Sequence, residues 1–125
     1  MKNTLIVALG LAAISLAACG KANTVTCENK IGDVAVEKKD LGAVFTVTCP
    51  GGCTAQGIWG TDVYTTDSAI CTAAAHAGVI KLADGGAVKV TVVKSLPSYK
   101  GSERNGVSSS DWGSAWGDTA FSVSK

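Results

Sequence analysis

One segment near the middle of the chain, residues 64–80, constrains the fold more than any other. Between Ser68 and Gly78 it contains five alanines, one cysteine and one histidine, with no Asp, Glu, Lys or Arg. Alanine is the best helix former, yet it buries little apolar area by itself. A surface helix normally carries large apolar residues on one face and charged residues on the other, and this segment shows neither. We therefore predict a short central helix with β-structure wrapped around it.

Residue type also marks both ends of this helix. Thr66, Asp67 and Ser68 are all favourable N-cap residues, so the start is signalled without being assigned to one of them. Gly78 lies where a helix C-terminus favours a residue with positive φ. The helix is therefore expected between these caps.

The segments around the helix are mostly typical of β-strands. Residues 43–49 and 87–93 are the strongest candidates, because β-branched residues are frequent in both and the even-numbered valines of 87–93 share one face. Residues 83–86 have the composition of a hairpin turn, and residues 96–116 form a long irregular stretch. Shorter strands are expected at residues 24–27 and 121–123, and a turn between residues 58–60 and 63–64. Without an internal repeat or a linker, the chain is predicted to form one α+β domain.

The first 18 residues are typical of a signal peptide. Thr4 to Ala18 is an uncharged apolar run that is too short to span a membrane comfortably. The residues Leu16-Ala17-Ala18-Cys19 resemble a bacterial lipobox. This resemblance implies cleavage before Cys19, a diacylglycerol on its sulfur and an acyl chain such as palmitate on the new N-terminus, which together anchor a protein stably. The alternative is an ordinary secretory signal with an A-x-A-like cleavage site.

Lipid attachment predicts how the rest of the chain is arranged and where it resides. Residues 19–24 would form a lipidated tether, and residues 25–125 an exported domain held at the membrane. Gly20, where Asp would signal retention, predicts the outer membrane of a Gram-negative cell, facing the periplasm or the cell surface. After residue 18 the chain has equal numbers of basic and acidic residues, since Lys2 is the one charge before that point. Zero net charge argues against a general nucleic-acid binder.

The remaining cysteines fit an exported domain. An even set predicts two disulfides, and sequence alone allows three connectivities. Zinc is the alternative, because four cysteines and His76 would be enough ligands, but the two cysteines of Cys-Pro-Gly-Gly-Cys are not spaced as a C-x-x-C knuckle. We therefore expect no metal and no cofactor. The four cysteines are Cys27, Cys49, Cys53 and Cys71.

Several spaced motifs together resemble the LCCL domain family. The pattern from Tyr64 to Ile80 matches its signature, with Ser68, Cys71, His76 and Gly78 in the expected positions. The resemblance covers about residues 25–125, here as a single-domain bacterial lipoprotein. It implies irregular β-sheets wrapped around a short central helix, and disulfides Cys27–Cys49 and Cys53–Cys71. Further matches are Cys49-Pro50-Gly51-Gly52-Cys53, Gly85-Gly86, Tyr99, Asn105-Gly106 and Trp116.

The resemblance also guides the functional prediction. Some LCCL domains are linked with binding bacterial lipopolysaccharide, and the motif residues are not an established catalytic centre. We therefore expect a non-enzymatic binding module at the bacterial envelope, with a glycan, a glycolipid such as lipopolysaccharide, or a protein as ligand. Trp112 and Trp116 lie in a Gly/Ser-rich loop and, with Tyr99, are the candidate ligand-contacting residues. The oligomeric state does not follow from the sequence.

His76 is the residue that would support an enzymatic alternative. Histidine is the commonest general base, so a small hydrolase could pair it with a serine and with Asp67 or Asp111, although no nucleophile elbow is present. In the structural interpretation, the His76 ring satisfies loop carbonyls at the last helical turn, and Asn105-Gly106 is a turn. A third alternative is a purely structural envelope lipoprotein. The candidate nucleophiles are Ser68, Ser102, Ser108, Ser109 and Ser110.

Overall fold

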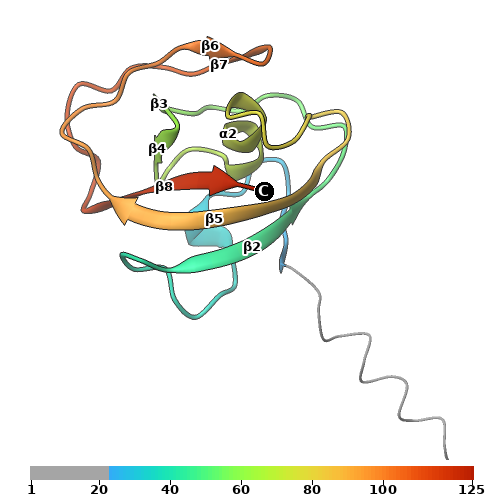
Figure 1. Cartoon of the computed structure of the whole chain (residues 1–125), viewed down its shortest axis with the longest axis horizontal. Helices are drawn as coiled ribbons and strands as arrows, with labels where there is room; N and C mark the ends of the chain where they lie inside the picture. The colour runs from blue at the N-terminus through green and yellow to red at the C-terminus, as the bar shows by residue number, and fades with distance from the viewer. Residues whose placement is uncertain (1–22) are drawn as a thin grey trace, which may run out of the picture.

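The computed structural model describes residues 23–125, and within them two sheets accompany one α-helix (Figure 1). The larger sheet has the strand order β1-β2-β5-β8-β4-β3, and the smaller sheet pairs β6 with β7. The predicted α+β class is confirmed. The signal peptide, Cys19 and most of the predicted tether lie outside the described residues. The elements are β1 (Asn23–Thr24), η1 (Ile31–Asp33), β2 (Val44–Cys49), β3 (Gly60–Thr61), β4 (Val63–Thr65), α2 (Ile70–His76), β5 (Gly86–Lys94), β6 (Glu103–Arg104), β7 (Val107–Ser108) and β8 (Thr119–Ser124).

Three long strands, β2, β5 and β8, form the centre of the larger sheet. Strand β5 pairs antiparallel with both neighbours, so that Val88 lies opposite Val47 and Val92 opposite Phe121. Alternate side chains of a strand point to opposite faces. Val88, Val90 and Val92 are at most 1% exposed and share the hydrophobic core with α2. The predicted apolar face of this strand is therefore confirmed.

The helix α2 is enclosed, as its composition predicted. All seven of its residues are buried, and Figure 1 shows it between the β6–β7 hairpin and the three long strands of the larger sheet. Ala73 and Ala74 are fully buried, so even a methyl group here has neighbours on all sides. Small side chains allow this close approach of surrounding backbone.

The start of α2 differs from the prediction. The helix begins at Ile70, with Ala69 as N-cap and no side-chain cap, so none of the three predicted N-cap residues serves that purpose. The hydroxyl of Ser68 instead accepts a hydrogen bond from the backbone N–H of Trp59 at 2.9 Å. The first N–H groups of a helix still need hydrogen-bond partners. The backbone N–H of Ile70 donates to the carbonyl of Asn29 at 3.0 Å. Tertiary contacts therefore replace local capping.

The end of α2 follows the prediction. Gly78 has a φ of 85°, which an L side chain rarely adopts. Its N–H donates to the carbonyl of Ala75 at 3.1 Å, and the N–H of Val79 donates to that of Ala74 at 2.9 Å. These two bonds form the Schellman motif that terminates many helices.

The disulfide prediction is confirmed in number and wrong in pairing. The bridges are Cys27–Cys53 and Cys49–Cys71, not Cys27–Cys49 and Cys53–Cys71. Cys49 ends β2 two residues after Val47, so both side chains point into the core, where Cys71 of α2 lies. Cys53 follows the Pro-Gly-Gly turn and is only half-buried, as is Cys27. The two core-facing cysteines, Cys49 and Cys71, therefore form one bridge, and the two half-buried cysteines form the other. Because all four cysteines are bridged, the zinc alternative is wrong.

Two further segments differ from expectation. Residues 83–86 form a turn with a bridge between Lys81 and Gly85, but the strand that follows pairs with β2 and β8 and not with residues 79–82. Residues 96–116 are partly regular, since they contain the β6–β7 hairpin. Its turn residues Asn105 and Gly106 both have positive φ, as a two-residue hairpin turn of type I′ requires.

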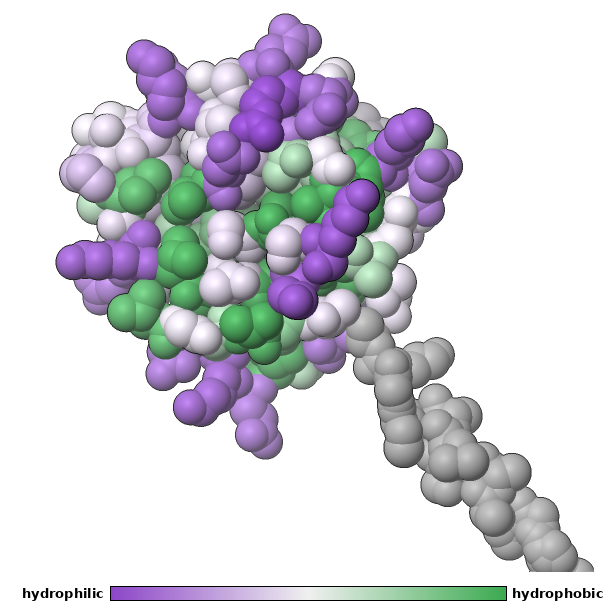
Figure 2. Space-filling model, in the orientation of Figure 1, coloured by the Kyte–Doolittle hydropathy of each residue, from purple (hydrophilic) through white to green (hydrophobic). Residues whose placement is uncertain are grey.

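The outer surface carries scattered apolar residues. Figure 2 shows one side of the molecule, on which apolar residues lie in separate groups among hydrophilic ones. Such scattering is ordinary for a folded protein. Within residues 23–125, no helix is long and apolar enough to cross a membrane. The large apolar side chains with substantial exposure are Leu41, Val44, Trp112 and Trp116.

Candidate functional site

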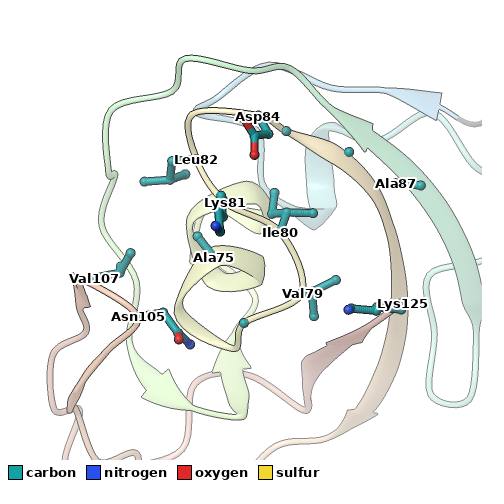
Figure 3. Close-up of a pocket in the computed structure, with 14 residues that line it drawn as sticks. Ala75, Val79, Ile80, Lys81, Leu82, Asp84, Ala87, Asn105, Val107 and Lys125 are labelled. Atoms are coloured by element: carbon teal, nitrogen blue, oxygen red, sulfur yellow. The ribbon is translucent and has the colours of Figure 1, made fainter.

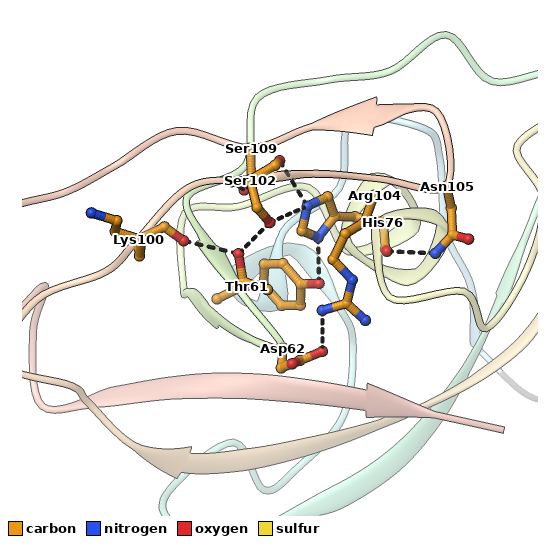
Figure 4. Close-up of polar contacts among 9 residues, drawn as sticks. Thr61, Asp62, His76, Lys100, Ser102, Arg104, Asn105 and Ser109 are labelled. Carbon is orange, nitrogen blue, oxygen red and sulfur yellow. Dashed lines mark hydrogen bonds and ion pairs between the residues drawn. The ribbon is translucent and has the colours of Figure 1, made fainter.

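His76 lies at the centre of a buried polar network (Figure 4). Its Nδ1 atom is 2.8 Å from the hydroxyl of Tyr64, and its Nε2 atom is 3.0 Å from the carbonyl oxygen of Ser102. A carbonyl oxygen can only accept, so Nε2 carries the hydrogen. In this tautomer, assigned from its partners, Nδ1 accepts the hydrogen bond that Tyr64 donates. Both ring nitrogens of His76 therefore have hydrogen-bond partners within the protein.

This geometry argues against His76 as a catalytic base. The hydroxyl of Ser102 is 3.2 Å from Nε2, which resembles a nucleophile–base pair. However, Nε2 already donates to the Ser102 carbonyl, and the same hydroxyl lies 2.6 Å from that of Thr61. The His76 side chain is also fully buried, so no substrate can reach it without local opening. The arrangement joins α2 to the segment that leads into β6.

The other residues of the enzymatic alternative do not complete a catalytic set. Asp67 accepts a hydrogen bond from the hydroxyl of Thr65 at 2.6 Å, and Asp111 accepts one from the backbone N–H of Gly101 at 2.6 Å. Neither carboxylate has a hydrogen bond to His76. Of the five candidate serines, Ser102 alone has a hydrogen bond to the ring, while the hydroxyl of Ser109 donates to the Ser102 carbonyl.

Tyr64 supports the histidine from the strand side. Its ring is fully buried, packs edge-on to His76 with centroids 5.6 Å apart, and lies 5.8 Å from Phe121. Burial raises the pKa of the Tyr64 hydroxyl, because the phenolate would lose its hydration. The phenol is therefore held in its neutral, donating form.

Asn105 has a second role beyond the hairpin turn. Its side-chain amide donates a hydrogen bond to the carbonyl of His76 at 2.9 Å, and so satisfies one of the last carbonyls of α2. The sequence predicted only the turn at this position. The contact depends on the hairpin lying over the end of the helix, which no local pattern indicates.

A groove of about 980 Å³ opens beside the end of α2 (Figure 3). It lies among the segment that leaves the helix, the β6–β7 hairpin and the start of β5. Its lining is mainly aliphatic, while Lys81, Lys125, Asp84 and Asn105 supply the polar groups. Sequence reasoning missed this groove, although the mostly apolar run of residues 79–82 after Gly78 was a weak signal. The aliphatic residues are Ala75, Val79, Ile80, Leu82, Ala87 and Val107.

The candidate ligand-contacting aromatic residues divide into two kinds. Trp112 and Trp116 are exposed, and their rings meet edge to face with centroids 5.5 Å apart. Tyr99 is only 3% exposed, and its hydroxyl accepts a hydrogen bond from the backbone N–H of Leu96 at 3.0 Å. Its backbone pairs with that of Trp112, but its phenol points inward, where the hydroxyl also lies 2.9 Å from that of Ser95. The expectation for Tyr99 is therefore wrong, because a buried side chain cannot meet a ligand at the surface.

Comparison with known proteins identifies the family. The chain matches the LCCL domain over residues 25–119. The protein belongs to the LCCL domain family. Human vitrin is 38% identical over 87 residues, which are 68% of this chain and 12% of vitrin. Human cysteine-rich secretory protein LCCL domain-containing 2 is 32% identical over 108 residues, 82% of this chain and 22% of that protein. Human cochlin is 35% identical over 129 aligned positions, 96% of this chain and 22% of cochlin.

This LCCL domain spans less than a quarter of the length of each of these relatives. The signature residues of the family form one packing unit in the structure: Ser68 accepts a hydrogen bond from the backbone of Trp59 just before β3, Cys71 bridges α2 to β2, and His76 joins α2 to the segment that leads into β6. Two disulfides are typical of exported proteins, and one relative is named as a secretory protein. These observations indicate an exported protein.

Proposed function

We propose that this LCCL domain is a non-enzymatic binding module, anchored through lipid on Cys19 to the bacterial outer membrane, whose groove beside α2 takes an anionic glycolipid of the lipopolysaccharide type. The observation that carries this proposal is the groove itself. Ligand sites are usually concave and mostly apolar, with a few placed polar groups. The His76 ring is buried and both of its nitrogens are hydrogen-bonded within the protein, which argues for binding over catalysis.

The chemistry of the groove suits an amphiphile. Its aliphatic floor, which includes Val79, Ile80 and Leu82, offers apolar surface to an acyl chain. Lys81 and Lys125 supply two ammonium groups against one acidic side chain, that of Asp84, and Figure 3 shows all three side chains at the groove. Lysine is a common phosphate ligand. A lipid that carries phosphate next to acyl chains therefore matches both the floor and the charge.

The groove is also largely preformed. Its floor begins directly after the Schellman motif at Gly78, and one wall is the end of α2, which the Cys49–Cys71 bridge ties to β2. A preformed site loses little conformational freedom on binding. Binding therefore requires no rearrangement of the core.

Calorimetric titration of the soluble form, residues 20–125, with purified lipopolysaccharide tests this proposal. We expect binding that weakens about tenfold in the double variant Lys81→Ala/Lys125→Ala, equivalent to about 1.4 kcal/mol. Lys89 and Lys94 are exposed lysines of β5 outside the groove, so Lys89→Ala/Lys94→Ala is the matched control. Equal loss in both double variants would show nonspecific charge attraction, and an absence of heat with wild-type protein would reject the ligand class.

The lipid anchor is tested separately, because it rests on the lipobox residues before the described domain. In a Gram-negative host the full chain should incorporate labelled palmitate and fractionate with the outer membrane, whereas Cys19→Ser should incorporate none. Labelled protein in the inner membrane would contradict the outer-membrane proposal. A wild-type protein that is cleaved without lipid would support the ordinary secretory signal instead.

A further inference from the structure

The three tryptophans of the chain, distant in sequence, line one small pocket away from the groove. Trp59 precedes β3, whereas Trp112 and Trp116 belong to the loop before β8. Together with Thr65 and Asp67 they enclose about 90 Å³. None of these five residues lines the groove beside α2. The pocket is therefore a separate feature with its own chemistry.

We propose that this pocket binds a quaternary ammonium group, with the indole rings around the cation and Asp67 opposing its charge. Cations are attracted to the faces of aromatic rings, and tryptophan gives the strongest attraction. Sets of aromatic walls are the usual way in which proteins hold methylated ammonium groups. Here three indoles and a carboxylate belong to the same lining.

The orientation of the rings fits this ligand. Trp112 and Trp116 stand almost perpendicular, at 86°, with centroids 5.5 Å apart. They are 39% and 38% exposed, so a ligand can reach them from solvent. Two perpendicular rings form a corner, and the half-buried Trp59 adds a third side. A rounded cation contacts all three, whereas a flat group would contact one.

Among residues 23–125, the carboxylate of Asp67 has no cationic partner. Within residues 23–125 the one ion pair joins Arg104 to Asp62, so no lysine or arginine nitrogen there lies within 4.0 Å of Asp67. Its Oδ1 atom accepts a hydrogen bond from Thr65 at 2.6 Å, which orients the group without neutralising it. Asp67 is half-buried and lines the pocket beside the three indoles. A bound cation would supply the missing charge.

Size and hydration select a quaternary ammonium over other ligands. The pocket encloses about 90 Å³, a small space that suits a compact group. A primary ammonium is strongly hydrated and carries three hydrogen-bond donors, but the lining offers one carboxylate and one threonine among the indoles. A trimethylammonium group has no N–H to satisfy. It therefore loses least on entering an indole-lined pocket.

The backbone positions of the rings are held by hydrogen bonds. The N–H of Trp59 donates to the hydroxyl of Ser68 at 2.9 Å, and its carbonyl accepts from the N–H of Thr65 at 3.2 Å. The backbone of Trp112 both donates to and accepts from Tyr99, at 2.9 and 2.7 Å. Tyr99 and Ser68 therefore support the pocket from behind while being buried themselves.

Titration of the mature protein in a non-ionic detergent tests the proposal, with tryptophan fluorescence and calorimetry as readouts. The ligands are tetramethylammonium, choline and 3,3-dimethyl-1-butanol, which has the shape of choline without its charge. We expect choline to bind about tenfold more tightly than the uncharged analogue. Asp67→Asn keeps an acceptor for Thr65 and should abolish most of this preference, as should Trp112→Ala with an unchanged melting temperature. Asp40→Asn, an exposed carboxylate outside both the groove and this pocket, is the control and should leave choline binding unchanged.

Two further titrations distinguish a lipid headgroup from a free solute as the source of the quaternary ammonium group. Phosphatidylcholine vesicles, compared with phosphatidylglycerol vesicles, present it as a lipid headgroup, and choline presents it as a free solute. Binding to the vesicles assigns a lipid, and binding to choline alone assigns a small solute. Equal binding of choline and its uncharged analogue, no effect of Asp67→Asn, or no binding of any cation would overturn the proposal. The groove variants at Lys81 and Lys125 should leave this binding intact, so failure here is distinct from failure of the proposed function.

Discussion

Removing the two disulfides one at a time should separate the effect of cross-linking from the effect of core packing. The bridges have sequence separations of 26 and 22 residues. The chain-entropy model therefore assigns them nearly equal stabilisation, about 3.5 kcal/mol each. Their surroundings differ, because Cys49 and Cys71 are at most 3% exposed whereas the other pair is half-buried. Removing the two buried sulfur atoms of Cys49 and Cys71 should therefore lower the unfolding free energy by about 1–2 kcal/mol more than removing the half-buried pair.

The assay is urea unfolding of two double variants beside the wild type. We expect Cys27→Ala/Cys53→Ala to lose about 3.5 kcal/mol of unfolding free energy, and Cys49→Ala/Cys71→Ala to lose about 5 kcal/mol. Both should show a larger dependence on urea, because the unfolded chain expands when a cross-link is removed. A greater loss from the half-buried pair would refute the packing argument. A peptide joining Cys27 to Cys49 in a non-reducing digest would refute the pairing itself.

Two further predictions concern the groups around His76. The Tyr64 pKa is raised by burial, so its contribution is complete below about pH 10 and is lost as the pH rises toward the folded-state value. Tyr64→Phe should cost about 1–3 kcal/mol at pH 7 by leaving Nδ1 without a donor, and its difference from wild type in urea unfolding should shrink above pH 10; a constant difference would contradict this. Asn105→Ala should cost about 2 kcal/mol in thermal unfolding and Asn105→Gly about half of that, because glycine loses the hydrogen bond but accepts the positive φ. Equal losses would show that the backbone conformation contributes nothing.

Local chemistry made several elements predictable before the structure was known. The alanine content of residues 69–77 indicated an enclosed helix, and Gly78 indicated its end. The alternating valines of β5 indicated its buried face. These features depend on side-chain volume, backbone conformation and strand periodicity, all of which act within a few residues. The family resemblance added the overall architecture, and its match over residues 25–119 confirms the family.

The same local chemistry misled the prediction wherever distant segments meet. Thr66, Asp67 and Ser68 are sound N-cap types, yet Ser68 bonds to Trp59 and the helix N–H groups find carbonyls elsewhere. Tyr99 lies in a loop of polar and small residues, but its ring is buried and its hydroxyl makes hydrogen bonds with Ser95 and the backbone of Leu96. The disulfide pairing depended on which cysteines face the core.

The sequence by itself therefore determined the class of fold, the central helix with its C-terminal cap, the two long strands and the presence of two disulfides. Tertiary structure alone decided the cysteine partners, the commitment of both His76 nitrogens, the groove beside α2 and the meeting of three tryptophans around Asp67. The physical reason is that a helix or strand is specified by neighbours along the chain. A pocket is specified by the packing of segments that are far apart in the sequence.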